Sequence, residues 1–210
     1  MYIIGNTYFN GIINVPNVYE PTSDEADLLN TNIDKYVRLF LQEVLGFEKF
    51  EELDSYIIEG QLQPTAPQMW LDLVNGATYT KDGKNYKWKG LKYDLGTSKI
   101  SILAYFVYFN QYQNSFNSQI GQVYVEPKNG INANPTEHLT QVFNEFVEMY
   151  QGNCNARYKG VYQVNDVLFV DYFGNHSNSG YVALTEFLLH NKEVYEVDPP
   201  FFEFQNTFLS

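Results

Sequence analysis

The sequence predicts a mainly α-helical protein: a small helical bundle with an inserted β-hairpin, an extended N-terminal arm and a C-terminal extension. An α+β fold is the alternative. Capped segments with apolar residues at helical spacing predict the bundle. A Lys-rich segment around a central Asp-Gly pair predicts the hairpin. These signals place the boundaries at 1–22 for the arm, 23–155 for the helical core, 77–89 for the hairpin within that core, and 156–210 for the extension.

The first 22 residues are rich in turn-forming Gly, Pro and Asn, which is typical of an arm that lies on another surface. Residues 22–25, Thr-Ser-Asp-Glu, then match a capping box. The apolar residues that follow keep helical spacing: Leu29, Ile33, Tyr36, Val37, Phe40, Leu41 and Val44. Gly46 would end this helix. The spacing from Phe47 to Ile57 predicts a second, short helix that stops near Gly60.

Two further helices are predicted in the core, besides a short amphipathic piece at 70–74. Thr97 or Ser98 would cap a helix that continues to Gln111, and its nearly all-round apolar surface predicts burial. A buried strand would carry the same residues, but we favour the helix. Asn134 followed by Pro135 opens the clearest amphipathic helix, which ends at Gly152. In the extension, the pattern of residues 180–190 predicts a helix, while that of residues 160–173 fits either a helix or a strand.

No pattern in the sequence indicates a catalytic, metal or cofactor site. Phosphate-binding Gly-rich loops, paired Cys motifs and the His-Glu-x-x-His pattern are all missing. The single Cys154 cannot form an internal disulfide, which fits a reducing compartment. His138, His176 and His190 are scattered, and we interpret them as a helix-start, a loop and a helix-end residue. Carboxylate pairs such as Glu51-Glu52 read as solvated helix faces.

Length and composition limit the remaining classes of function. The 210 residues, 44% of them apolar, suffice for a buried core. No run approaches the roughly 20 apolar residues that cross a bilayer, and the N-terminus lacks a signal-peptide pattern, so we expect no membrane and synthesis in a cytoplasm. The formal charge of −12 argues against a protein that grips nucleic acid through phosphate contacts.

The charges divide into two regions of opposite sign. Residues 24–59 hold ten acidic and three basic side chains, whereas 80–99 hold six Lys and two Asp. Unlike patches on one molecule favour head-to-tail contacts between copies. We therefore expect the hairpin to meet the acidic helices of the next copy through Lys81, Lys84, Lys87, Trp88 and Lys89. The alternative is that lysines only protect an exposed strand edge from mispairing.

Five segments within residues 23–152 together resemble the head-to-tail connector or neck-ring proteins of tailed bacteriophages, especially those of crAss-like phages. They are Trp70-Leu-Asp-Leu-Val-Asn-Gly76, Tyr86-Lys-Trp-Lys-Gly-Leu91, Ser98-Lys-Ile-Ser-Ile-Leu-Ala-Tyr-Phe-Val-Tyr108, Gly121-Gln-Val and Phe143-Asn-Glu-Phe-Val-Glu-Met-Tyr150. They describe packing and turns, not a reaction. The resemblance covers the helical core, while the segment from Arg157 to Ser210 is longer than the connector pattern.

This resemblance implies a structural, non-enzymatic virion protein that forms a ring, dodecameric in this family, between portal and tail. Its partners would be further copies of itself, the portal protein and neighbouring neck or tail proteins. Packaged DNA would be only a non-specific occupant of the channel. Aromatic residues of the extension would anchor in an adjoining subunit, namely Phe201, Phe202, Phe204 and Phe208. The alternatives are a tail-completion or capsid-auxiliary protein, a monomeric module that binds a small ligand, and an enzyme with a scattered site.

Overall fold

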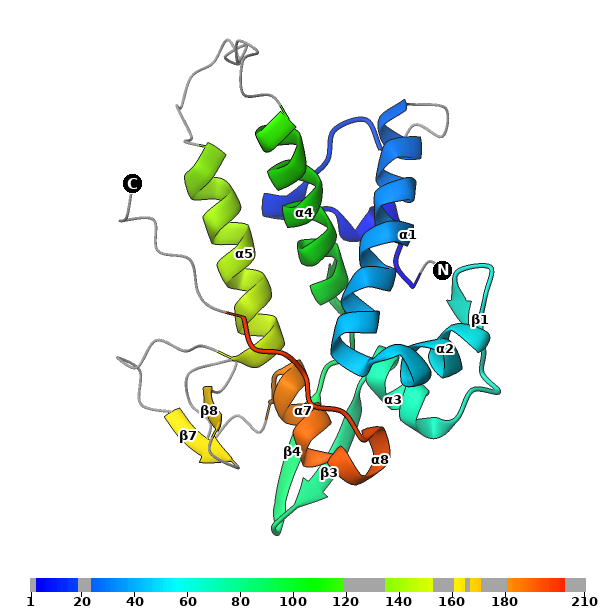
Figure 1. The fold of residues 1–210 in the computed structure, drawn as a ribbon, viewed down its shortest axis with the longest axis vertical. Helices are drawn as coiled ribbons and strands as arrows, with labels where there is room; N and C mark the ends of the chain where they lie inside the picture. Colours follow the sequence, from blue (N-terminus) through cyan, green and yellow to red (C-terminus); the bar gives the residue numbers. More distant parts are fainter. Residues whose placement is uncertain are drawn as a thin grey trace.

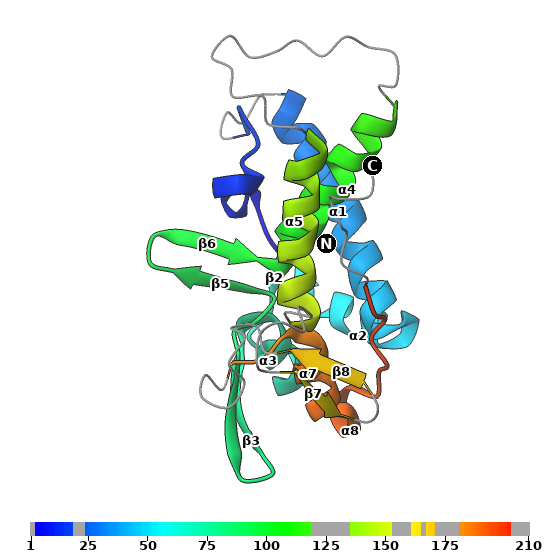
Figure 2. The same cartoon turned by 90° about the vertical axis from the view of Figure 1, so that its left-hand side faces the viewer.

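Three long helices form the body of the fold in the computed structural model, which describes residues 3–18, 24–118, 135–152, 161–164, 167–170 and 181–202. They are α1 (Asp24–Leu45), α4 (Ile102–Ser118) and α5 (Pro135–Gln151), and α4 stands between the other two in Figure 1. Short helices and hairpins lie below and beside them (Figure 2). The mainly helical fold with small antiparallel hairpins confirms the predicted class.

Aromatic side chains join the three long helices. The ring of Phe40 on α1 lies 5.0 Å from Phe106 on α4 and 5.7 Å from Phe146 on α5, and the last two are 5.3 Å apart. Each such pair contributes roughly 0.5–1.5 kcal/mol beyond the apolar area that it buries. The apolar residues predicted on the inner face of α1 are all buried, as helical spacing requires.

The second helix is shorter than predicted. Helix α2 (Phe47–Ser55) stops before Ile57, which instead belongs to strand β1 (Ile57–Ile58), paired with β2 (Gln61–Leu62). The turn residues Glu59 and Gly60 both have positive φ, 50° and 76°, which is the geometry of a two-residue hairpin. Gly60 therefore forms a hairpin turn and not a helix end.

The predicted hairpin is confirmed, and a second one follows it. Strands β3 (Ala77–Lys81) and β4 (Lys84–Trp88) turn at Asp82 and Gly83, both at positive φ. Strands β5 (Lys92–Leu95) and β6 (Ser98–Ser101) form the unpredicted hairpin, which turns at residues 96–97. In Figure 2, the first hairpin extends downward from the bundle and the second extends to the left.

Helix α4 consequently starts later than the predicted caps at Thr97 or Ser98. The residue that caps it is Ser101, which is fully buried at the end of β6. Its hydroxyl oxygen accepts a bond from the backbone N–H of Leu103 at 3.1 Å and donates to the carbonyl of Leu91 at 2.7 Å. The predicted helical conformation is confirmed from Ile102 onward, whereas the four residues before Ile102 form strand β6.

The N-terminal segment lies on the chain's own core. It contains two single-turn helices, η1 (Asn6–Tyr8) and η2 (Gly11–Ile13). Its buried residues are Ile3, Ile4, Phe9, Ile13, Val15 and Val18. The carbonyl of Ile3 accepts a bond from Lys92 Nζ at 2.9 Å, and Asn10 donates to the carbonyl of Lys99 at 2.8 Å. The described part of the arm therefore covers hairpin β5–β6 and needs no second chain to rest on.

The remaining elements pack at the lower end of the bundle (Figure 1). Helix α3 (Gln68–Asn75) confirms the amphipathic piece around Trp70. Helix α7 (Leu184–His190) begins later than the predicted residue 180, because Tyr181 and Val182 run alongside β4 as an extra strand-like segment. Helix α8 (Lys192–Tyr195) follows, and β7 (Val161–Val164) pairs with β8 (Val167–Val170) in the stretch that the sequence left open.

Candidate interaction surfaces and a buried polar cluster

Hairpin β3–β4 is fixed at its base by a close backbone contact. A Cβ atom on Gly76 would lie 2.7 Å from backbone atoms of Trp88 and Lys89, and one on Gly90 would lie 2.7 Å from the backbone of residues 74–76. Both glycines have strongly positive φ, 93° and 99°. Only glycine allows the chain entering and the chain leaving the hairpin to touch in this way.

Trp88 anchors the hairpin in the chain's own core. Its indole N–H donates to the carbonyl of Leu73 at the end of α3, at 2.9 Å, and its ring stacks on Phe187 of α7 with centroids 5.6 Å apart. Only 4% of Trp88 is exposed. The sequence places Trp88 among the residues expected to contact a partner, whereas in the structure almost all of its surface is used within the chain.

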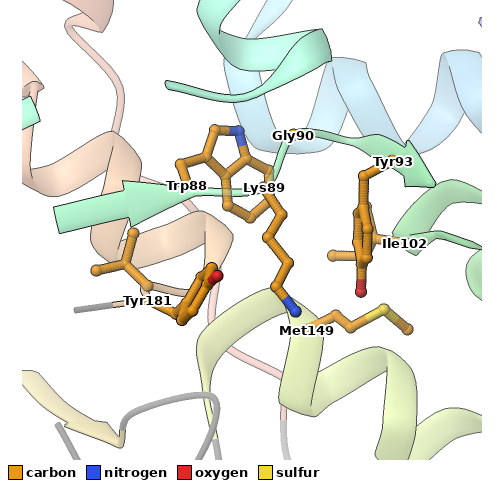
Figure 3. A pocket seen from close by; sticks show the side chains of 8 residues that line it. Trp88, Lys89, Gly90, Tyr93, Ile102, Met149 and Tyr181 are labelled. Carbon is orange, nitrogen blue, oxygen red and sulfur yellow. The ribbon is translucent and has the colours of Figure 1, made fainter. Parts of the chain in front are cut away.

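The four hairpin lysines divide into two inward and two outward side chains. Lys81 Nζ donates to the carbonyl of His190 at 3.3 Å. Lys89 Nζ lies between the rings of Tyr93 and Tyr181, 4.9 and 5.0 Å from their centroids (Figure 3). Burial, and then the neighbouring charge of Lys87, lower the pKa of Lys89. Lys84 and Lys87 are exposed, so they are the two that can meet another molecule.

The space around Lys89 is too small for a ligand. Besides the two tyrosines it is lined by Ile102 and Met149 and by the end of β4 (Figure 3). The free volume is about 20 Å³, which accommodates about one water molecule. The aromatic side chains here therefore hold the protein's own ammonium group through cation–π attraction.

A larger, open groove lies in the angle between hairpins β3–β4 and β5–β6. Its volume is about 400 Å³. Trp88, Tyr93, Leu95 and Tyr181 supply its apolar surface, and Lys87 and Lys89 supply positive charge. Leu95 is 60% exposed and adds an apolar side chain to the edge of this groove.

Helices α1 and α2 carry the opposite charge where they join. Glu43, Glu48 and Glu51 are all exposed around the bend at Gly46. Phe47, the first residue of α2, lies between Glu43 and Glu48 in the sequence and is 70% exposed. In Figure 2, α2 lies on the right of the molecule, hairpin β5–β6 extends to the left and hairpin β3–β4 extends downward, so the elements that carry the glutamates and the lysines lie apart.

A buried polar cluster under the first hairpin was not predicted. Glu186 and His190, one turn apart on α7, have side chains only 2% and 6% exposed, with Oε1 and Nε2 3.7 Å apart. The Tyr79 hydroxyl is hydrogen-bonded to His190 Nδ1 at 2.9 Å. His190 does end α7, as the sequence predicts, but its contacts with Glu186 and Tyr79 were not predicted. The i, i+4 spacing of these two residues within an otherwise apolar helix was the signal that could have revealed the cluster.

Burial controls the proton equilibria of this cluster. It raises the pKa of the Glu186 carboxyl to about 8. It also raises the pKa of Tyr79, with the nearby Glu186 and then Tyr86 adding to the shift. Glu186 therefore keeps its proton near neutral pH. Because the side chains are closed off from solvent, the cluster joins the hairpin to α7 and offers no surface to a substrate.

The end of the chain, as far as it is described, packs on α5. The amide side chain of Gln151 makes two hydrogen bonds with the backbone of Phe202, donating to its carbonyl at 2.6 Å and accepting from its N–H at 2.9 Å. The Tyr150 hydroxyl donates to the carbonyl of Pro200 at 2.7 Å. Phe202 is half-buried against the bundle, while Phe201 is 54% exposed. Phe204 and Phe208 lie outside the described residues.

The other candidate residues show no site. His138 Nε2 is hydrogen-bonded to the Tyr108 hydroxyl at 3.2 Å, whereas His176 and Cys154 lie outside the described residues. Within the described part of the chain, no three His, Cys, Asp or Glu side chains gather closely enough to hold a metal ion. None of the described helices is both long and apolar enough to cross a bilayer.

Comparison with known proteins identifies no relative. No family model matches the chain, and no curated protein and no solved structure matches it.

Proposed function

We propose that this chain is a structural virion protein of a tailed bacteriophage, whose copies assemble head to tail into a ring between portal and tail. The observation that carries the proposal is that exposed glutamates lie on α1 and α2 and exposed lysines on hairpin β3–β4, elements that lie apart in Figure 2. When two copies join through unlike surfaces, the pair still has one free acidic surface and one free lysine-bearing surface. Further copies can therefore add until the ring closes.

The protruding hairpins supply the means of reaching a neighbour. Lys84 and Lys87 are directed to solvent on a hairpin that Gly76, Gly90 and Trp88 hold firmly at its base. A rigid projection loses little conformational entropy on binding, which favours association. The described arm and tail segments are already satisfied within the chain, so these hairpins are the main projecting elements of the described chain.

The overall charge supports a place around a DNA channel. Each copy carries a formal charge of −12, and a ring multiplies this field. A negative wall repels phosphate and keeps packaged DNA from adhering as it passes. DNA is thus an occupant of the channel and not a ligand in this proposal, and the portal protein and neighbouring neck or tail proteins are the partners above and below.

Electron microscopy of the purified protein, alone and mixed with its cognate portal protein, tests this proposal. We expect rings with a central hole, stacked on the portal in the mixed sample. Sedimentation velocity at increasing protein concentration provides the corresponding mass. A protein that stays monomeric in both samples would overturn the proposal, and a filament or a closed dimer would point to another virion component.

A further inference from the structure

We infer that Phe47, surrounded by glutamates at the start of α2, inserts into the groove between hairpins β3–β4 and β5–β6 of a second copy of this chain. The inference rests on the proposed function, because it specifies the contact by which copies would join. It identifies the residues on both sides of that contact.

The exposure of Phe47 is the first step of the argument. Phe47 is the most exposed large apolar side chain among the described residues, at 70%. It occupies the first position of α2, immediately after Gly46 at φ 75°, so the bend between α1 and α2 projects it outward. Aromatic side chains exposed in this way are typical anchors of protein interfaces.

The groove has the chemistry to receive that side chain. Tyr93, Leu95 and Tyr181 offer apolar contact, and the volume of about 400 Å³ exceeds the need of a single phenyl ring. The rings of Tyr93 and Tyr181 are held in place by Lys89 between them (Figure 3). A prearranged apolar site of this kind binds with a small entropic cost.

Charge decides which surface fits the groove. Glu43, Glu48 and Glu51 are exposed around Phe47, and Lys87 and Lys89 line the groove. The one acidic residue of the groove, Asp94, lies 3.9 Å from Lys99, which offsets its charge. An aromatic residue with three exposed glutamates near it in sequence therefore meets a groove that offers both aromatic side chains and lysines, so apolar contact and charge attraction favour the same pairing.

Geometry requires the two surfaces to come from different copies. Helix α2, which begins with Phe47, lies on the right in Figure 2, whereas hairpin β5–β6 extends to the left and hairpin β3–β4 downward, so Phe47 and the groove belong to separate parts of the molecule. The contact is heterologous, because each copy offers one Phe47 and one groove. Each copy can therefore bind one neighbour through Phe47 and another through its groove, so the same contact repeats from copy to copy.

The first test is site-directed crosslinking that leaves Phe47 in place. Cys154 is changed to Ser, and Glu48→Cys and Leu95→Cys introduce one thiol beside Phe47 and one in the groove. A short bismaleimide should then link the double variant into a ladder of dimers, trimers and larger species. Each single variant has only one thiol at every contact and should remain monomeric. A double variant that stops at dimers would overturn the inference, because it would show a symmetric contact.

The second test measures assembly of Phe47→Ala by sedimentation velocity, with Leu28→Ala as the matched control. Leu28 is also exposed, on the outer side of α1. We expect Phe47→Ala to weaken assembly at least tenfold, because burial of a phenylalanine side chain is worth more than a factor of ten. Leu28→Ala should assemble like the wild type.

The outcomes separate this inference from the proposed function. If the wild type forms rings and Phe47→Ala forms them equally well, the contact is wrong and the ring proposal stands. If the wild type forms no ring even with the portal protein, the proposed function itself fails. The thermal unfolding of Phe47→Ala should match that of the wild type, since an exposed side chain contributes little to the stability of the monomer.

Discussion

Gly76 and Gly90 make the hairpin possible, because a Cβ on Gly76 would meet the backbone of Trp88 and Lys89, and a Cβ on Gly90 would meet the backbone of residues 74–76. We expect Gly76→Ala or Gly90→Ala to destabilise the fold by on the order of 3 kcal/mol, since each substitution adds both a clash and a left-handed backbone strain. Denaturant unfolding measures this change. Gly5→Ala is the control, because a Cβ at Gly5 meets nothing within 4 Å. Equal midpoints for the Gly76 variant and the Gly5 variant would refute the explanation.

The proton on Glu186 gives the fold a specific dependence on pH. Its pKa is raised from 4.5 to about 8 in the folded protein, so between these values the folded state holds a proton that the unfolded state releases. This contribution to stability is therefore complete below pH 4.5 and is lost as the pH rises through 8. Glu186→Gln removes it and leaves the neutral shape nearly unchanged.

We expect the wild type to lose stability relative to Glu186→Gln as the pH rises from 5 to 8, at ~1.4 kcal/mol per pH unit in the middle of the range. Urea unfolding of both proteins at several pH values measures the difference. Glu51→Gln, at an exposed site, serves as the control and should follow the wild type. Parallel curves for wild type and Glu186→Gln would show that the carboxyl is ionised in the folded state.

The sequence predicted those helices and hairpins whose turn and cap residues lie within the element itself. The hairpin at Asp82-Gly83 and the helix that opens at Pro135 carry their own turn and cap residues, so both were found. The β5–β6 hairpin was missed because Ser101, its last residue, is held by the carbonyl of Leu91, ten residues earlier. A contact of that kind is invisible to spacing rules, and the apolar run after Ser98 read as one helix.

The same limit applied to the candidate site. Nothing near Lys89 in the sequence indicates that Tyr181, ninety-two residues later, closes over it, so the inward and outward lysines could not be told apart. The burial of Glu186 likewise depends on the hairpin that covers α7. The two charged regions were visible in the sequence, whereas their positions in separate parts of the molecule required the fold.

The last described residues belong to the folded core. Truncation after Asp198 would remove the acceptor of the Tyr150 hydroxyl and both backbone partners of Gln151. We expect it to cost roughly 2 kcal/mol in the free energy of unfolding. A chain that ends at Phe202 keeps these contacts and is the matched control. Equal thermal midpoints for the two truncated chains would contradict this assignment.

For the whole molecule, the separation of charge is the property that most constrains how copies can meet. Residues 24–59 carry a net −7, from ten acidic and three basic side chains, and residues 80–99 carry a net +4, from six Lys and two Asp. Of the four hairpin lysines, Lys81 and Lys89 are partly buried by contacts within the chain, whereas Lys84 and Lys87 are exposed. The outward charge of hairpin β3–β4 therefore depends on Lys84 and Lys87.

Reversal of these two charges should weaken assembly. We expect Lys84→Glu/Lys87→Glu to raise the concentration needed for ring formation roughly tenfold at about 0.1 M salt, because attraction to the acidic helices becomes repulsion. The difference should shrink at about 0.5 M salt, where the screening length is several times shorter than the span of the patches. Sedimentation velocity at both salt concentrations measures it. The control, Lys128→Glu/Lys159→Glu, changes the net charge equally but leaves both residues 24–59 and residues 80–99 unchanged, so it separates a local contact from a general effect of charge. If both double variants weaken assembly to the same degree, the lysines act only through net charge, and they do no more at this hairpin than protect its edge.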